Sequence, residues 1–319
     1  MKLFLAATLC ASLLQAQPRP ATQADFDRWM KELSNWGRWG KDDELGTLNF
    51  ITPTTRLAAA KLVREGVAIS LSHEAEKEAA PDNSRPFVHE MLSSSETPGA
   101  EIFTDSFKVA HHGIIHTHMD ALCHFSYNGK LYNGFSPKEV TSKGAAKLTI
   151  EAARTGIFAR GVLIDIPELK GKPYLEPTDV IYPEDLDAWE KKSGVRVKKG
   201  DVVFIRTGRW ARRNDKGPWS MAERAGLHAT CVRWLKQRDI AMLGSDASSD
   251  ARPSQVEGVQ QPVHTLVIVA MGTPIFDNCD LEQLSAEAKK RKRWDFLLTT
   301  SPLTVAGATG SVLNPIAVF

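Results

Sequence analysis

Three short, nearly uninterrupted apolar runs limit most strongly how this chain can fold. They are Gly161-Val162-Leu163-Ile164-Asp165-Ile166, Val202-Val203-Phe204-Ile205-Arg206 and Ile240-Ala241-Met242-Leu243-Gly244. A strand with one solvated face alternates apolar and polar residues, whereas a continuous apolar run is typical of a strand covered on both faces. The runs therefore predict buried strands at the centre of a sheet.

Helix signals separate these runs. Residues 183–192 read as a helix, and Ser220 with Glu223 three residues later forms a capping box that predicts the start of another. The simplest architecture is one α/β domain with a mixed β-sheet. Further elements are expected outside the runs: a helix from Thr52-Pro53 to Val63, a strand at 67–71, a long surface loop at 72–98, a helix at 281–291 and a strand at 296–299.

Five of the nine histidines lie in the fourteen residues from His111 to His124. Within this stretch His116, His118 and Asp120 are spaced by two, and side chains alternate faces along a strand. If the stretch is a strand, these three side chains point the same way. Two imidazoles and a carboxylate that converge are a good nest for a divalent metal ion.

The N-terminus and the composition set the protein class. Met1-Lys2, an apolar run at 3–14 and Ala16 predict a signal peptide over residues 1–16, which leaves an exported mature domain at 17–319. The odd set Cys123, Cys231 and Cys279 predicts no disulfide framework. A net charge of +2 gives no argument for nucleic acid, and no later run is long enough to span a membrane.

Other chemistries fit the sequence less well than a metal site. Gly307-x-x-Gly310 lacks the strand and helix of a dinucleotide fingerprint, and no Gly-x-Ser-x-Gly elbow occurs. Cys123 and His124 are a conceivable nucleophile and base, but neighbours on an extended chain point apart. The metal interpretation meets none of these difficulties.

The stretch His116-Thr117-His118-Met119-Asp120-Ala121-Leu122-Cys123-His124-Phe125 resembles the signature of the putative cyclase family, His-x-Gly-Thr-His-x-Asp-x-Pro-x-His-Phe. That family includes bacterial kynurenine formamidase and isatin hydrolase. Further landmarks in family order are residues 36–49, Arg206-Thr207-Gly208, Gly244-Ser245-Asp246, His264, Asp277-Asn278 and 302–311. The resemblance implies a cyclase-like (swivelling β/β/α) fold over nearly the whole mature chain.

The resemblance also implies site residues. His118, Asp120 and His264 match metal-binding positions, Asp277 falls near a metal-binding glutamate, and His124 matches a catalytic histidine. The first histidine of the signature is Ile114 here, which puts a two-metal site in doubt. His116 stands at the signature glycine and either supplies the missing imidazole or is a hydrogen-bonded core residue. We expect one zinc or manganese ion, held by some of the five residues His116, His118, Asp120, His264 and Asp277.

Such a site predicts a metal-dependent hydrolase that acts on a carbon–nitrogen bond of a small molecule, with His124 as acid and base. Two rivals stay open: a metal-dependent lyase, dehydratase or cyclase, and a metal-binding protein without turnover. We expect a homodimer or larger homo-oligomer, with no nucleic-acid or membrane partner. The sequence leaves the roles of His111, His112, Arg206, Asp246, Gln255 and Glu257 undecided.

Overall fold

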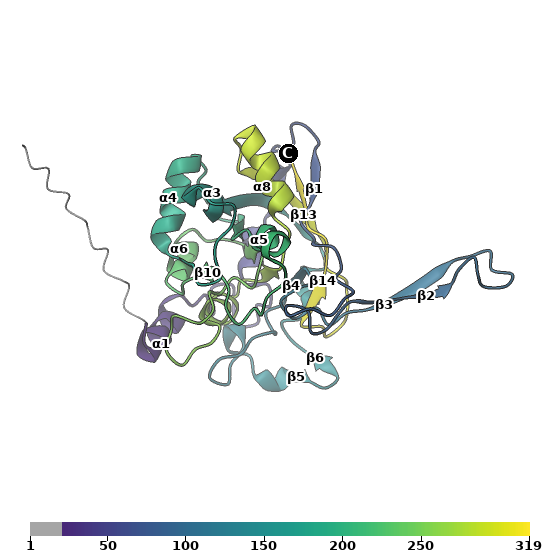
Figure 1. The fold of residues 1–319 in the computed structure, drawn as a ribbon. Helices are drawn as coiled ribbons and strands as arrows, with labels where there is room; N and C mark the ends of the chain where they lie inside the picture. Colours follow the sequence, from purple (N-terminus) through teal and green to yellow (C-terminus); the bar gives the residue numbers. More distant parts are fainter. Residues whose placement is uncertain (1–20) are drawn as a thin grey trace, which may run out of the picture.

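A nine-stranded mixed sheet forms the centre of the computed structural model, which describes residues 21–319 (Figure 1). The signal peptide predicted at 1–16 lies outside the described residues. Along the sheet the strands are β1 (Ala68–Ser70), β15 (Ile316–Val318), β13 (Asp295–Thr300), β7 (Ile157–Asp165), β9 (Val202–Arg206), β11 (Met242–Ser245), β12 (Ile275–Asp277), β4 (His118–Asp120) and β14 (Gly310–Val312).

The middle of this sheet is parallel and its two sides are antiparallel. Strands β7, β9, β11 and β12 run parallel to one another, while β4 runs antiparallel to both β12 and β14. The helices are α1 (Gln23–Glu32), α2 (Pro53–Ala60), α3 (Ile166–Lys170), α4 (Pro183–Ser193), α5 (Arg209–Lys216), α6 (Cys231–Gln237), α7 (Pro262–His264), a π-helix (Thr265–Ala270) and α8 (Glu282–Arg291). The prediction of one α/β domain with a mixed sheet is confirmed.

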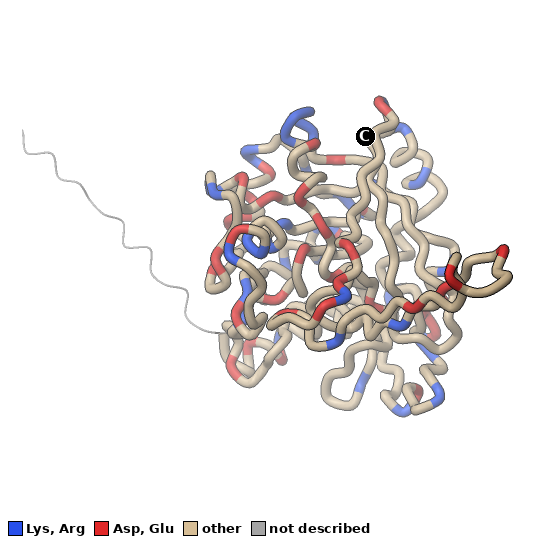
Figure 2. The backbone as a smooth tube through the Cα atoms, turned by 45° about the vertical axis from the view of Figure 1, so that its right-hand side comes forward, with Lys and Arg blue, Asp and Glu red and all other residues tan. Residues whose placement is uncertain are grey.

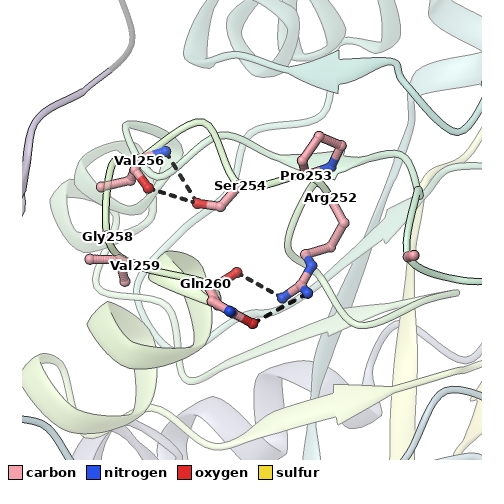
Figure 3. Close-up of a pocket in the computed structure, with 8 residues that line it drawn as sticks. Arg252, Pro253, Ser254, Val256, Gly258, Val259 and Gln260 are labelled. Atoms are coloured by element: carbon pink, nitrogen blue, oxygen red, sulfur yellow. Dashed lines mark hydrogen bonds between the residues drawn. The ribbon is translucent and has the colours of Figure 1, made fainter.

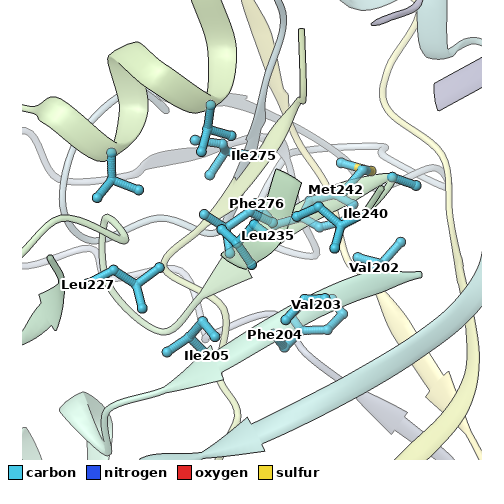
Figure 4. Packing of buried hydrophobic residues seen from close by; sticks show 14 of the residues in the cluster. Val202, Val203, Phe204, Ile205, Leu227, Leu235, Ile240, Met242, Ile275 and Phe276 are labelled. Carbon is cyan, nitrogen blue, oxygen red and sulfur yellow. The ribbon is translucent and has the colours of Figure 1, made fainter. Parts of the chain in front are cut away.

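The three apolar runs form the core, as their composition predicted. Phe204 of β9 stacks on Phe276 of β12, with ring centroids 5.9 Å apart, and both side chains are fully buried (Figure 4). Gly244 of β11 lies between them, and a Cβ there would come within 2.6 Å of the Phe204 ring. Burying a side chain of this size stabilises the fold by roughly 1.5–3 kcal/mol, so this contact fixes how β9, β11 and β12 pack.

Two expectations from the sequence are wrong. Ser220 and Glu223 do not start a helix, because Arg224 bonds to Arg252 through the backbone and β10 (Gly226–Leu227) pairs with β8 (Val180–Ile181); this extended chain excludes a helix until α6. Residues 72–98 are not all loop either. They include β2 (Val88–Ser93), which pairs with β3 (Thr104–Lys108) in a hairpin that projects from the body (Figure 1).

A further two-residue strand pair joins β5 (Val140–Thr141) to β6 (Gly144–Ala145). Short 3₁₀ turns occur at Gly46–Phe50, Tyr132–Gly134, Pro137–Glu139 and Ile150–Ala153. Across residues 21–319, none of the helices combines the length and the apolar character needed to cross a membrane.

Candidate metal centre

The centre of the site is β4, which places His118 and Asp120 on one face of the sheet. Its two neighbours bring the rest of the chain to that face. Asp277 of β12 lies directly opposite His118 in the antiparallel ladder, and Gly310 of β14 lies opposite Asp120. The strand starts only at His118, so the alternation expected for His116, His118 and Asp120 does not extend to His116.

Three imidazoles each have one ring nitrogen engaged away from the site and the other turned toward the carboxylates. His118 Nδ1 lies 2.8 Å from the carbonyl oxygen of His116, and His264 Nδ1 donates to Asp250 Oδ2. His112 Nε2 lies 2.8 Å from the hydroxyl of Thr309. A hydrogen bond at one ring nitrogen fixes the tautomer and orients the other nitrogen, as is usual for metal-binding histidines.

The free ring nitrogens converge on Asp120 and Asp277. His118 Nε2 and His112 Nδ1 lie 3.3 and 2.9 Å from Asp120 Oδ1, and His264 Nε2 lies 3.1 Å from Asp277 Oδ2. Yet Asp120 Oδ1, Asp277 Oδ1 and His112 Nδ1 are buried and make no hydrogen bond of acceptable geometry. Buried polar atoms are rarely left without a partner, and acceptors that face one another in this way fit a shared cation.

Two groups of donor atoms meet at Asp120. One consists of His112, Asp120 and His124, the other of His118, Asp120 and Asp277, and within each the donor atoms lie within 4.8 Å of one another. Burial alone would raise the pKa of Asp120, but the imidazoles of His124, His112 and His118 hold it well below its usual value. Asp120 is therefore a carboxylate, the form that binds a cation.

The buried carboxylates around the site also shift the pKa of His264 and His118. Burial alone would lower the pKa of His264, but the carboxylates of Asp277 and Asp250 raise it well above the usual value. For His118 burial is again outweighed, here by the hydrogen bond and charge of Asp120, and the pKa is raised. Without a cation these imidazoles hold protons between the carboxylates, and a bound metal ion would replace those protons.

His124 lies at the open side of the group. Its ring stacks on His112 with centroids 3.7 Å apart, its Nε2 lies 3.8 Å from Asp120 Oδ1, and its side chain is 26% exposed. Burial and the neighbouring imidazoles lower its pKa to about 4, against the pull of Asp120. The imidazole is therefore neutral at neutral pH and can accept a proton.

His116, expected at the metal, is held elsewhere. Its Nε2 lies 3.4 Å from the carbonyl oxygen of Arg85 and its ring packs edge-on against Phe87. It belongs to neither group of donor atoms. The imidazole that stands beside His118 and Asp120 comes from His112, because the chain turns at Gly113 before β4 begins.

The group opens into a cavity of about 390 Å³, a volume in the range of small-molecule sites. The metal-binding candidates form one part of its wall, and Ile114 and Phe125 add apolar surface. The lining residues are His112, Gly113, Ile114, His118, Asp120, His124, Phe125, Ser126, Arg224, Ser248, Gln261, His264 and Asp277.

The residues whose roles the sequence left undecided lie mostly outside this cavity. Arg206 pairs with Asp165 and Glu282, while Asp246 accepts bonds from the backbone of Thr207, Gly208 and Arg209. Gln255 and Glu257 bond through the backbone to Ala21. Burial and the imidazoles of His112 and His118 lower the pKa of His111 to about 4, and its ring packs against His112.

The thiol chemistry considered from the sequence finds no support. Burial raises the pKa of Cys123 to about 12, so this side chain is a thiol and a poor nucleophile at neutral pH. Cys123, Cys231 and Cys279 are all buried, and no disulfide joins any two of these three.

Sequence reasoning missed four polar residues of the cavity, namely Ser126, Arg224, Ser248 and Gln261. None of them belongs to a motif: Arg224 precedes β10, while Ser248 and Gln261 both lie in the segment between β11 and α7. The sequence offered a signal only for Ser248, which closely follows the buried run 240–244. Ligands in α/β sheets bind beyond the carboxyl ends of strands.

Known proteins share this architecture. A crystal structure described as a novel cyclase is 31% identical to this chain, covers 91% of it and 99% of its own length, and matches with a TM-score of 0.83. Isatin hydrolase A from Ralstonia solanacearum is 21% identical, covers 83% of this chain and 97% of its own, and has a TM-score of 0.55. Isatin hydrolase A from Labrenzia aggregata is 19% identical, covers 83% of this chain and 98% of its own, and has a TM-score of 0.56.

The two isatin hydrolases, at 21% and 19% identity, share the fold of this chain. A comparison with curated proteins gave no match. The family model described as "Putative cyclase" matches residues 69–251, which is more than half of the chain. With its fold and this match, the chain belongs to the putative cyclase family.

Proposed function

We propose that this protein is a hydrolase that uses a divalent metal ion to cleave a carbon–nitrogen bond in an amide, an N-formyl group or a cyclic amide of a small molecule. The residues that would hold the ion are His118, Asp120, His264 and Asp277, with His112 in the place expected for His116. One observation carries the proposal: three imidazoles, each with one ring nitrogen bonded away from the site, turn the other toward Asp120 and Asp277, whose buried Oδ1 atoms have no hydrogen-bond partner among residues 21–319. Mixed nitrogen and oxygen donors suit zinc or manganese.

A divalent ion in such a site supplies Lewis acidity, which polarises a carbonyl group and acidifies a water molecule. The chain supplies the rest. His124 Nε2, neutral and beside Asp120, takes a proton from the attacking water and gives it to the leaving nitrogen. The stacked ring of His112 and the edge of Phe125 hold the His124 ring in place for this transfer.

The test combines metal analysis with a substrate panel. The purified protein, loaded with zinc or manganese, is assayed on N-formylanilines, isatin-like rings and lactones. His124→Ala should keep its metal and lose about 10²–10⁴-fold in turnover, the usual contribution of general acid–base catalysis, while the exposed His89→Ala serves as control. Full metal occupancy without turnover of any amide would contradict the proposed hydrolase activity. Turnover of lactones alone would mean that the enzyme cleaves a carbon–oxygen ester bond and not a carbon–nitrogen bond.

We further propose export and self-association. The apolar leader at 1–16 supports export, and the mass of the mature protein would locate the cleavage predicted after Ala16. The β2–β3 hairpin supports a homodimer or larger homo-oligomer: Ile102, Phe103 and Phe107 are 75%, 58% and 60% exposed on an arm that also carries carboxylates (Figure 2). A two-stranded hairpin is marginally stable alone, so a second copy would cover it. A monomeric mass in solution would contradict this.

A further inference from the structure

Two buried polar side chains in the cavity have donors without partners. Arg224 is 6% exposed and Ser248 is 4% exposed, and both line the cavity that holds the metal-binding candidates. Arg224 Nε and Ser248 Oγ make no hydrogen bond with any part of the chain that the structure describes. The side chain of Arg224 donates one hydrogen bond, from Nη1 to the carbonyl oxygen of Met221 at 2.8 Å.

Two other arginines buried to a similar degree, Arg206 and Arg209, also have an Nε without a partner, but both lie beside carboxylates and Arg224 does not. Arg206 pairs with Asp165 at 3.0 Å and with Glu282 at 2.6 Å. Arg209 lies 3.7 Å from Asp82 and donates to Asn278 at 2.7 Å. Within residues 21–319, Arg224 forms no ion pair, because no carboxylate oxygen lies within 4.0 Å of its guanidinium nitrogens.

The two carboxylates whose charges act on Arg224, Asp250 and Asp277, are bonded to other groups. Asp250 accepts bonds from the backbone of Val263 and His264 and from the His264 ring, and Asp277 faces His264 and His118. Burial lowers the pKa of Arg224, and the charges of Asp250 and Asp277 offset only part of that effect. An arginine nevertheless stays protonated in proteins. A buried cation without a paired anion is costly, so a ligand that brings the anion would be bound strongly.

We propose that Arg224 and Ser248 form a carboxylate-binding subsite, and that the substrate is an amide that carries a carboxylate. This rests on the proposed function for the reacting bond, but the subsite itself is defined by a buried guanidinium that lacks a carboxylate partner and by the unpartnered hydroxyl of Ser248. The planar fork of Arg224 matches a carboxylate, and the Ser248 hydroxyl donates a further bond. The substrate is thus held between this subsite and the metal-binding wall, with Ile114 and Phe125 offering apolar contact to its body.

The chain offers a matched control for charge. Arg252 bonds to Arg224 through the backbone, with Arg224 N donating to Arg252 O at 3.0 Å, so the two arginines are neighbours across a bridge. The Arg252 side chain instead faces an adjacent cavity of about 360 Å³, where its guanidinium donates to Gln260 (Figure 3). Arg252→Gln therefore removes the same charge from nearly the same place without touching the proposed subsite.

The experiment measures benzoate and benzamide binding by calorimetry, with both metal-loaded and metal-depleted protein. Benzoate should bind at least about tenfold more tightly than its neutral isostere benzamide. Arg224→Gln should weaken benzoate binding tenfold or more in both metal states, and Ser248→Ala by several-fold. Arg252→Gln should change it less than twofold. Arg224→Lys keeps the charge but loses the fork, and should lie between the wild type and Arg224→Gln.

Each other outcome overturns the subsite. An equal loss of benzoate affinity in Arg224→Gln and Arg252→Gln would mean that only the overall charge matters. Equal affinity for benzoate and benzamide would show that the subsite does not recognise a carboxylate. An effect seen only with metal would assign the anion to the ion instead. Ser248→Ala, a small change, decides the matter if Arg224→Gln does not fold. Failure of the hydrolase appears separately, as absent turnover with benzoate binding and its Arg224 dependence intact.

Discussion

At the scale of single residues, the choice between two histidines defines the site. His116 has the spacing that alternation on a strand requires, but it precedes the strand and its Nε2 faces the carbonyl oxygen of Arg85. His112 lies six residues before His118 and still reaches Asp120 Oδ1, at 2.9 Å. Gly310 makes room for it, because a Cβ there would come within 2.7 Å of the His112 ring.

This difference predicts opposite results for two alanine variants. His112→Ala should weaken zinc binding by more than the roughly 10–100-fold seen when an outer partner of a ligand is lost, because it removes a donor atom. His116→Ala should change the affinity by less than about threefold. Competition with a chromogenic chelator measures both. A larger loss in His116→Ala than in His112→Ala would restore the interpretation from the sequence alone.

At the scale of elements, one asparagine joins the turn before β4 to the turn after β12. Asn278 is buried and has a φ of 55°. Its Nδ2 donates to the carbonyl oxygens of Gly113 and His116, at 2.9 and 3.2 Å, and its Oδ1 accepts from Arg209. It therefore holds the segment that carries His112 without touching the candidate ligands' donor atoms.

Asn278→Gly removes these three bonds and keeps a residue that tolerates the positive φ. At about 1 kcal/mol for each bond, the free energy of unfolding should fall by ~3 kcal/mol. Zinc affinity should fall by about tenfold or more, since the histidine segment loses its anchor. The control is Asn128→Gly, the same exchange at an exposed turn residue with a φ of 46°. Denaturant unfolding and zinc titration give the two quantities, and an unchanged affinity would mean that Asn278 serves stability alone.

At the scale of the whole molecule, the candidate ligands join distant parts of the chain. The candidate ligands within residues 112–124 meet His264 and Asp277 only because β4 is inserted between β12 and β14. The unfolded chain lacks such a site, so a bound ion should stabilise the native state. At a free metal concentration of 100 times Kd the gain is about 2.7 kcal/mol.

Removal of the metal should therefore lower the melting temperature. At roughly 2.1 cal/mol/K per residue, a domain of about 300 residues unfolds with an entropy of about 0.6 kcal/mol/K, so chelation should lower Tm by about 4 °C. Differential scanning calorimetry with and without EDTA measures the change. Asp120→Asn, which removes the charge shared by both donor groups, should show almost no change with EDTA, and a full shift in that variant would place the ion elsewhere.

The sequence by itself determined the fold class. The continuous apolar runs, Phe204 among them, can be satisfied only by strands buried on both faces, and periodicity is a local property that a sequence displays. It also indicated that His118 and Asp120 share a face, because both lie within one strand. The helix expected at Ser220 was lost because the backbone pairing of Arg224 with Arg252 overrode a local capping signal.

Only the tertiary structure decided which groups meet at Asp120 and which remain without partners. His112 displaces His116 because the strand begins at His118, a boundary set by pairing with β12 and β14. Arg224 and Ser248 enter the cavity from separate loops, and nothing in their sequence neighbourhood marks them as unpaired. Whether a buried charge has a partner depends on distances across the whole fold, which no local pattern encodes.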